Sequence, residues 1–143
     1  MSIQHILDRK GAEVIKISPL ATVKNAAERM RLHRIAALVV EGGDPIGGIV
    51  TERDIVRAIA EYGEQALLMA VRQIMTHAII TITAEDSVTR AMGLMTRHRI
   101  RHLPVVADGR LAGIISIGDV VKHRLEDLEL ESNILRDAYI AAH

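Results

Sequence analysis

The chain contains the heptapeptide Gly-Ile-Val-Thr-Glu-Arg-Asp at residues 48–54 and Gly-Ile-Ile-Ser-Ile-Gly-Asp at residues 113–119. The two stretches lie 65 positions apart and share a glycine, a hydroxyl residue and an aspartate at the same spacing. At this offset residues 14–57 align with residues 79–122 without a gap, and a His-Arg-Ile run recurs at 33–35 and 98–100. The chain is therefore a tandem repeat.

Hydrophobic periodicity changes in the same order within each copy. Short β-branched runs are followed by an amphipathic helix, a two-stranded hairpin with a Gly- and Asp-rich turn, and a second helix. The expected elements are strands at 14–17 and 79–82, helices N-capped by Thr22 and Ser87, hairpins at 37–50 and 103–115, and helices opened by residues 51–54 and 116–119. The sequence thus predicts an α/β (α+β) fold made of two β-α-β-β-α units.

The repeats divide the chain into four parts. We assign residues 1–64 to the first repeat, 65–75 to a connecting helix, 76–124 to the second repeat and 125–143 to a C-terminal helical extension. The extension combines apolar residues with an acidic face: Leu125, Leu128, Leu135 and Tyr139, against Glu126, Asp127, Glu129, Glu131 and Asp137. We interpret it as an ordinary terminal helix with a solvated face, a dedicated partner-binding helix being the alternative.

Composition excludes several classes of protein. The 143 residues are 49% hydrophobic and carry 18 basic and 18 acidic side chains, which argues against disorder and against a polyanion-coating role. The absence of cysteine excludes disulfides, thiolate metal sites and a cysteine nucleophile. The N-terminus has no leader pattern and no run approaches a membrane span, so we expect a cytoplasmic protein. Tyr62 and Tyr139 are the only aromatic residues, so a bound purine would have to be held by aliphatic side chains.

From about Ile3 to Lys122 the chain resembles a pair of CBS domains, named after cystathionine β-synthase and called a Bateman module when paired. The resemblance rests on the two heptapeptides, which match Gly-x-x-Thr/Ser-x-x-Asp, and on residues 99–105, Arg-Ile-Arg-His-Leu-Pro-Val. It implies a pseudo-two-fold regulatory module that binds AMP, ADP, ATP, NAD or S-adenosylmethionine in the cleft between repeats. It also implies that the motif aspartate accepts ribose hydroxyls and that the Thr or Ser meets phosphate.

The same motif has a structural explanation. Thr51 with Asp54, and Ser116 with Asp119, have the spacing of a capping box that closes the first turn of a helix. A glycine before each helix would leave room for a ligand beside the backbone, and the helix N-terminus offers N–H groups to an anion. The two interpretations are compatible, and we expect ligand contact as well as capping.

Basic residues cluster at residues 97–102, and the cluster differs between the repeats. His33 and His98 match each other, and a favourable interaction with a helix C-terminus accounts for both. Arg101 and His102 correspond to alanines, and the resemblance to CBS domains implies that side chains at these positions contact phosphate, so we expect unequal sites. Arg53 corresponds to Gly118 and is a third candidate, because an arginine at a helix N-terminus opposes the dipole unless an anion is nearby. The candidate ligand-binding residues are Lys16, Thr51, Arg53, Asp54, Arg99, Arg101, His102, Pro104, Ser116, Gly118 and Asp119.

We assign no catalytic residue and no metal ligand. His98 and His102 have a zinc-ligand spacing, but Pro104 and the apolar run place His102 in or near a strand.

The chain is interpreted as a non-enzymatic sensor of an adenine nucleotide (AMP, ATP or NAD), with no catalytic cofactor and an unnamed downstream protein. The alternative is a dimerisation module with degenerate, empty sites. DNA binding through residues 52–57 is disfavoured by the zero net charge. Apolar residues on the second helix of each repeat predict a homodimer.

Overall fold

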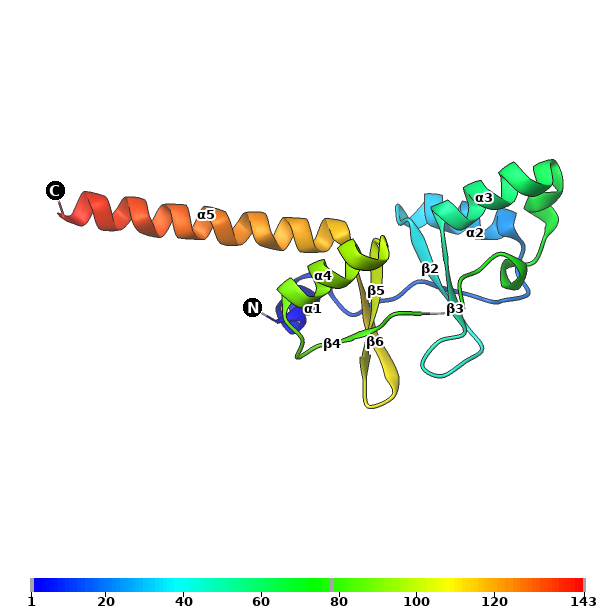
Figure 1. Cartoon of the computed structure of the whole chain (residues 1–143), viewed down its shortest axis with the longest axis horizontal. Coiled ribbons are helices and arrows are strands. Elements are labelled where there is room, and N and C mark those ends of the chain that lie inside the picture. The colour runs from blue at the N-terminus through cyan, green and yellow to red at the C-terminus, as the bar shows by residue number, and fades with distance from the viewer. Residues whose placement is uncertain (1, 78, 143) are drawn as a thin grey trace.

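The two repeats form two similar three-stranded sheets, seen in a computed structural model that describes residues 2–77 and 79–142 (Figure 1). In each sheet the first strand pairs in parallel with the second, and the second pairs antiparallel with the third. The first sheet contains β1 (Lys16–Ile17), β2 (Ala37–Val40) and β3 (Gly48–Thr51); the second contains β4 (Ile82–Thr83), β5 (His102–Ala107) and β6 (Arg110–Ser116). The predicted strands and hairpins are confirmed, although the opening strands β1 and β4 span two residues each.

The helices begin where the local sequence predicts. Thr22 and Ser87 cap α2 (Val23–His33) and α4 (Val88–His98), because each side-chain oxygen accepts a hydrogen bond from a backbone N–H of the first turn. The second helices, α3 (Glu52–Tyr62) and α5 (Ile117–Ala142), follow directly from β3 and β6. His33 and His98 end α2 and α4, as expected for side chains that favour a helix C-terminus.

The segment between the repeats is helical but does not form one connecting helix. It consists of two 3₁₀ helices, η1 (Gly63–Leu68) and η2 (Val71–Gln73). Gly63 ends α3 with a positive φ of 64°, which a residue with a side chain rarely adopts. Ala66 and Val71 are then buried against the first repeat, so tertiary packing rather than a helical period shapes this segment.

An N-terminal helix, α1 (Ile3–Lys10), was not predicted and packs on the second repeat. The Ile3 N–H donates to the Asp86 carbonyl (2.9 Å), just as the Val71 N–H donates to the Ala21 carbonyl (2.8 Å) in the other half. Ile3 and Val71 are fully buried in the second and first cores, respectively. The segment that precedes each repeat therefore completes the core of the other one, which gives the pair its pseudo-two-fold character.

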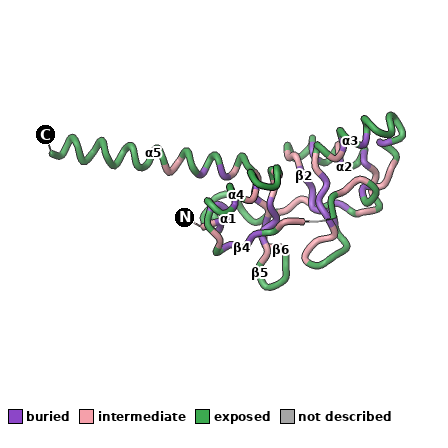
Figure 2. Tube along the Cα trace, in the orientation of Figure 1, coloured by how far each residue is buried: buried purple, intermediate pink, exposed green. Residues whose placement is uncertain are grey.

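Helix α5 extends far beyond the sheets (Figure 1), and its burial changes along its length (Figure 2). Val120 and His123 near its start are buried, whereas every described residue from 128 onward is exposed. The terminal helix is confirmed, but its distal half has no packed face. The expectation of an ordinary terminal helix with one solvated side therefore holds only for its first turns.

Candidate functional site

A cleft of about 620 Å³ lies between the repeats. Its walls come from the start of α3, the segment around Ile79 and the stretch from the end of α4 into β5. The lining residues are Ala36, Ile49, Thr51, Glu52, Arg53, Asp54, Arg57, Thr76, Ile79, Ile80, His98, Arg99, Ile100, Arg101, His102 and Pro104. Seven of the eleven candidate ligand-binding residues lie here: Thr51, Arg53, Asp54, Arg99, Arg101, His102 and Pro104.

Asp54 forms the predicted capping box while keeping one oxygen for other contacts. The Thr51 N–H donates to Asp54 Oδ2 (2.9 Å), and the Asp54 N–H donates to Thr51 Oγ1 (3.3 Å). Asp54 Oδ1 accepts only a long hydrogen bond from Thr76 Oγ1 (3.4 Å) among the bonds of the described residues. Because a carboxylate oxygen has two acceptor sites, Oδ1 can still accept hydroxyl groups from a ligand in the cleft.

Basic side chains dominate the charge of the cleft. Four arginines line it, Arg53, Arg57, Arg99 and Arg101, against two acidic residues, Glu52 and Asp54. Such an excess favours a ligand that carries negative charge.

Arg53 reaches across the cleft from one repeat to the other. Its Nη1 donates to the Arg99 carbonyl (3.2 Å), which belongs to the left-handed residue that ends α4. The partner of Arg53 at the start of α3 is therefore a backbone carbonyl, whereas the sequence predicted that an anion would offset its unfavourable interaction with the helix dipole. One of its five N–H donors is used in this bond, and the guanidinium keeps others for phosphate.

His102 has a depressed pKa. Burial lowers the pKa of its imidazole, the positive charges of Lys10 and Arg101 lower it further, and Asp119 partly opposes them. The neutral imidazole is therefore favoured in the free protein. A bound phosphate would have to raise this pKa to hold the imidazolium form.

Aliphatic side chains supply the apolar surface of the cleft. Ile49, Ile79, Ile80, Ile100 and Pro104 line it together with the polar residues. This agrees with the requirement that a purine be held without aromatic stacking. Ile79 and Ile80 were predicted only as strand residues, because a β-branched run does not reveal which of its members face a cleft.

Gly48 and Gly113, the glycines of the two motifs, are required for packing within the chain rather than for ligand binding. A Cβ at Gly48 would lie 2.9 Å from Met75 Sδ and from the Thr76 carbonyl oxygen, and a Cβ at Gly113 would lie 2.8 Å from Leu7 Cδ2. These glycines leave room for the crossing segments of the chain itself. The prediction that they make space for a ligand is replaced by this packing requirement.

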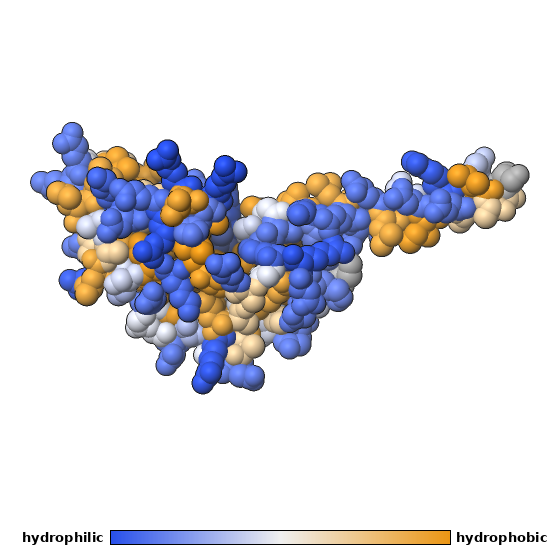
Figure 3. Space-filling view, turned by 180° about the vertical axis from the view of Figure 1, so that it is seen from behind, coloured by the Kyte–Doolittle hydropathy of each residue, from blue (hydrophilic) through white to orange (hydrophobic). Residues whose placement is uncertain are grey.

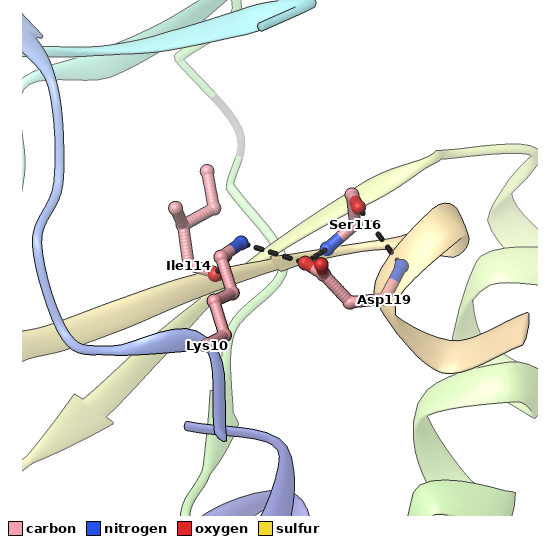
Figure 4. A network of polar contacts seen from close by, with 4 residues as sticks. All are labelled: Lys10, Ile114, Ser116 and Asp119. Atoms are coloured by element: carbon pink, nitrogen blue, oxygen red, sulfur yellow. Dashed lines mark hydrogen bonds and ion pairs between the residues drawn. The ribbon is translucent and has the colours of Figure 1, made fainter. Parts of the chain in front are cut away.

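Asp119, the counterpart of Asp54 in the second repeat, is bound by the side chain of Lys10 (Figure 4). Lys10 Nζ donates to Asp119 Oδ2 (2.6 Å) and to the Ile114 carbonyl (2.7 Å). The Ser116 N–H donates to the same Asp119 oxygen (2.8 Å), and the Asp119 N–H donates to Ser116 Oγ (3.2 Å), so the second capping box is also formed. Burial alone would raise the pKa of Asp119, but its hydrogen bonds with Lys10 and Ser116 lower it overall.

Four candidate residues thus lie outside the cleft. Ser116 and Asp119 belong to this lysine-bound box, and Gly118 lines a shallow depression along α5. Lys16 lies in β1 with its side chain exposed, and its carbonyl accepts a hydrogen bond from Arg29. Sequence reasoning missed both Lys10 and Thr76, since neither belongs to a repeated motif and each acts over a long sequence separation.

Comparison with known proteins identifies the family. The model of the CBS domain matches residues 5–61 and 71–126, which together make up most of the chain. The chain belongs to the CBS domain family. It is a tandem CBS pair from a family of commonly regulatory modules, as the resemblance had implied.

Individual CBS proteins support this assignment. The mitochondrial CBS domain-containing protein CBSX3 of Arabidopsis thaliana is 45% identical over 106 residues, which cover 71% of this chain and 52% of that protein. The chain therefore spans about half the length of this relative. The crystal structure of the CBS-domain containing protein ATU1752 from Agrobacterium tumefaciens superposes with a TM-score of 0.84 at 42% identity, covering 87% of this chain and 99% of that one. A hexameric CBS-CP12 protein from bloom-forming cyanobacteria gives a TM-score of 0.74 at 34% identity, covering 85% and 69%.

In the part of the chain that the structure describes, none of the helices combines sufficient length with sufficient apolar character to cross a bilayer.

Proposed function

We propose that this CBS pair binds an adenosine-containing nucleotide (AMP, ATP or NAD) in the cleft between its repeats and transmits the bound state to another protein. The observation that supports this most is the composition of the cleft. One wall offers a carboxylate whose Oδ1 can accept further hydrogen bonds, another offers arginines, and the remainder is aliphatic. These are the groups required by ribose hydroxyls, phosphate and a purine ring, respectively.

The division of roles follows from position. Asp54 Oδ1 would accept the ribose hydroxyls, and Arg53 with Arg101 would hold the phosphate. Ile79 and Ile80 would contact the base. Ligand bound to Arg53 and Arg101 would contact both repeats, so its binding energy would favour one relative placement of the two.

The two sites would not be equivalent. In the second repeat, Lys10 already neutralises Asp119, so a ribose there would have to compete with a partly buried ion pair. We therefore assign the nucleotide to the cleft beside Asp54, at one ligand per chain.

The occupied second site also favours an alternative function, a dimerisation module with no nucleotide at all. Association in either case would use the exposed apolar residues of α3 and α5, among them Val56, Ile59, Val121 and Leu125. The hexameric relative shows that CBS modules of this kind are found in oligomers.

Thermal unfolding in the presence of a nucleotide panel distinguishes the two functions. Adenosine, AMP, ADP, ATP, NAD and S-adenosylmethionine are each tested near millimolar concentration, with GMP as the control for base selectivity. A sensor is stabilised by its ligand in proportion to the logarithm of ligand concentration over Kd. We expect an adenine nucleotide to raise the Tm of the parent chain and to raise that of Asp54→Ala much less. Equal melting in all conditions would support the dimerisation module.

A further inference from the structure

We propose that α5 from Val121 onward, which includes its distal half, forms a parallel, in-register two-stranded coiled coil with α5 of a second copy of this chain. This goes beyond nucleotide binding and is independent of it. The half-helix projects from the body with both of its sides in solvent (Figures 1 and 2). Apolar side chains gather along it on the molecular surface (Figure 3).

An apolar seam runs along α5 at the spacing of a coiled coil. Starting from Val121, residues follow at alternating steps of four and three, which is the a/d pattern of a heptad. The seam residues with their exposed fractions are Val121 (51%), Leu125 (56%), Leu128 (44%), Leu135 (71%) and Tyr139 (65%), with Ser132 between them. A helix that presents such a seam to water is stabilised when a second helix covers it.

The seam is separate from the face that packs on the second repeat. That face contains Val120 and His123, which are buried, and Asp127, which is half-buried. At about 100° per residue, the seam lies roughly 120° around the helix from it. A second helix can therefore approach the seam without displacing the body of its own chain.

The charged residues beside the seam favour a second copy of α5 as the partner and a parallel orientation of the two helices. In a parallel pair, the residue before an a position faces the residue after the d position of the second helix, five residues later. Arg124 then faces Glu129 of the second copy, and Glu131 faces Arg136 of the second copy. Symmetry repeats both contacts, so all four flanking pairs unite opposite charges.

An antiparallel pair that covers the whole seam would do the opposite. It would place Glu129 against Glu129, Glu131 against Glu131, and Lys122 against Arg136 of the second copy. Like charges at these positions are destabilising. The charge pattern thus fits a second copy of this chain in the parallel direction, with the two bodies at the same end.

Cysteine cross-linking tests the register, because the chain has no cysteine of its own. Ser132→Cys places one thiol in the seam, where parallel in-register helices bring it against its own copy. Asp137→Cys, on the outer side of the same half-helix, is the matched control. We expect mild oxidation of the full chain to convert Ser132→Cys to a covalent dimer at least about tenfold faster than Asp137→Cys. Equal rates would overturn the proposal.

Charge reversal tests the direction and the partner. Glu129→Arg replaces two attractive pairs by two repulsive ones, and at about 0.2–0.5 kcal/mol per pair in each sense this weakens the dimer roughly fourfold to thirtyfold. Adding Arg124→Glu to the same chain should restore the parent affinity, whereas Asp137→Arg should leave it unchanged. Sedimentation of full chains over a concentration series measures each dimer Kd. A monomeric parent, or a double variant as weak as Glu129→Arg, would contradict the proposal.

Discussion

Asp54 and Asp119 occupy equivalent positions at the start of α3 and α5 but have different partners. Both carboxylates close a capping box, yet among the described residues Asp54 Oδ1 accepts a hydrogen bond from Thr76 alone, whereas Asp119 is bound by the Lys10 ammonium. A ligand hydroxyl can use the free acceptor of the first without breaking an ion pair. Repetition in sequence therefore need not give two equal sites, because Lys10, which lies outside the aligned stretches 14–57 and 79–122, binds the carboxylate of one of them.

Replacing Asp54 by Ala should weaken AMP about tenfold to a hundredfold, since a charge-assisted hydrogen bond contributes about 1.5–3 kcal/mol. The matched change Asp119→Ala should affect AMP affinity far less and act mainly on stability, because it leaves Lys10 without its carboxylate. Calorimetric titration of both variants gives the affinities, and thermal unfolding without ligand gives the stabilities. If both variants bind AMP with the affinity of the parent and only unfold at a lower temperature, the two aspartates act only as helix caps.

His102 should make AMP binding depend on pH. Its pKa is depressed in the free protein, and an adjacent phosphate would raise it, so binding takes up a proton between the two values. Affinity should fall as the pH rises through this window, which begins below the ordinary histidine pKa of about 6.5. The phosphate of AMP ionises nearby and acts in the opposite sense, so His102→Ala at each pH and adenosine at each pH are the controls. An identical pH profile for parent and His102→Ala would show that the His102 imidazole does not interact with the bound phosphate.

The same depressed pKa has a consequence for the unliganded protein. Unfolding releases the imidazole from burial and restores its ordinary pKa, so the unfolded state binds more protons between the two values. His102 therefore contributes stability above its unfolded pKa that is lost as the pH falls from above the ordinary histidine pKa of about 6.5 to below it. Denaturant unfolding across this range should show a smaller acid destabilisation for His102→Gln than for the parent. A larger one would contradict the direction of the shift.

At the scale of elements, the crossing segments explain residues that a ligand had seemed to require. Leu7 of α1 packs against Gly113 of β6, and Met75 packs against Gly48 of β3. Each glycine thus lets the segment from outside its repeat approach the strand. In the first repeat the polar residues 51–54 that follow Gly48 line the cleft, so one short stretch meets a packing need and also borders the candidate site.

Gly113→Ala should destabilise the fold by about 1–3 kcal/mol, because its Cβ would overlap Leu7 Cδ2 and displace this buried side chain from its packed position. Combined with Leu7→Ala, the loss should be smaller than the sum of the two single losses, since the truncated side chain removes the overlap. Gly93→Ala in α4 is the control: its Cβ would enter open space, and the helix should gain about 0.5–1 kcal/mol. Chemical denaturation measures all four variants; additive losses would show that Leu7 is not the obstacle.

Local signals predicted most elements, whereas long-range contacts were beyond them. Thr22 and Ser87 marked helix starts correctly because an N-cap is satisfied within its own turn. Helix α1 was missed because it has no repeated counterpart in register and its burial depends on strands about 80–110 residues away. For the same reason Lys10, the residue that makes the sites unequal, left no pattern in the sequence. The cleft residues from 51 to 54 and from 99 to 104 were predictable, as they lie in the motif and in the basic cluster.

At the scale of the whole molecule, the two repeats depend on each other for their cores. Ile3, Ile6 and Leu7 belong to the core of the second repeat, although they lie at the start of the first one in the chain. Val71, which precedes the second repeat, completes the core of the first. Each repeat would expose apolar surface without the other's leading segment, so the pair is the folding unit.

Deleting residues 1–10 should therefore loosen the distant repeat first. The deletion removes three buried apolar side chains and the Lys10 ion pair from the second repeat, while the first core keeps all its members. Hydrogen exchange should show lost protection in β5 and β6 before β2 and β3. Uniform loss across both sheets, or preferential loss in the first, would contradict the interlocked arrangement.

The central claim, that the cleft between the repeats is a nucleotide site, is tested most directly by calorimetric titration of AMP into the full chain. The control titrations are adenosine into the same chain, and AMP into the variants Arg53→Ala and Asp54→Ala. The account predicts one AMP per chain, a strong loss of affinity in both variants, and little effect of Arg53→Ala on adenosine, which lacks the phosphate that Arg53 would hold. No binding of any adenine nucleotide, or AMP binding unchanged in Asp54→Ala and Arg53→Ala, would contradict it.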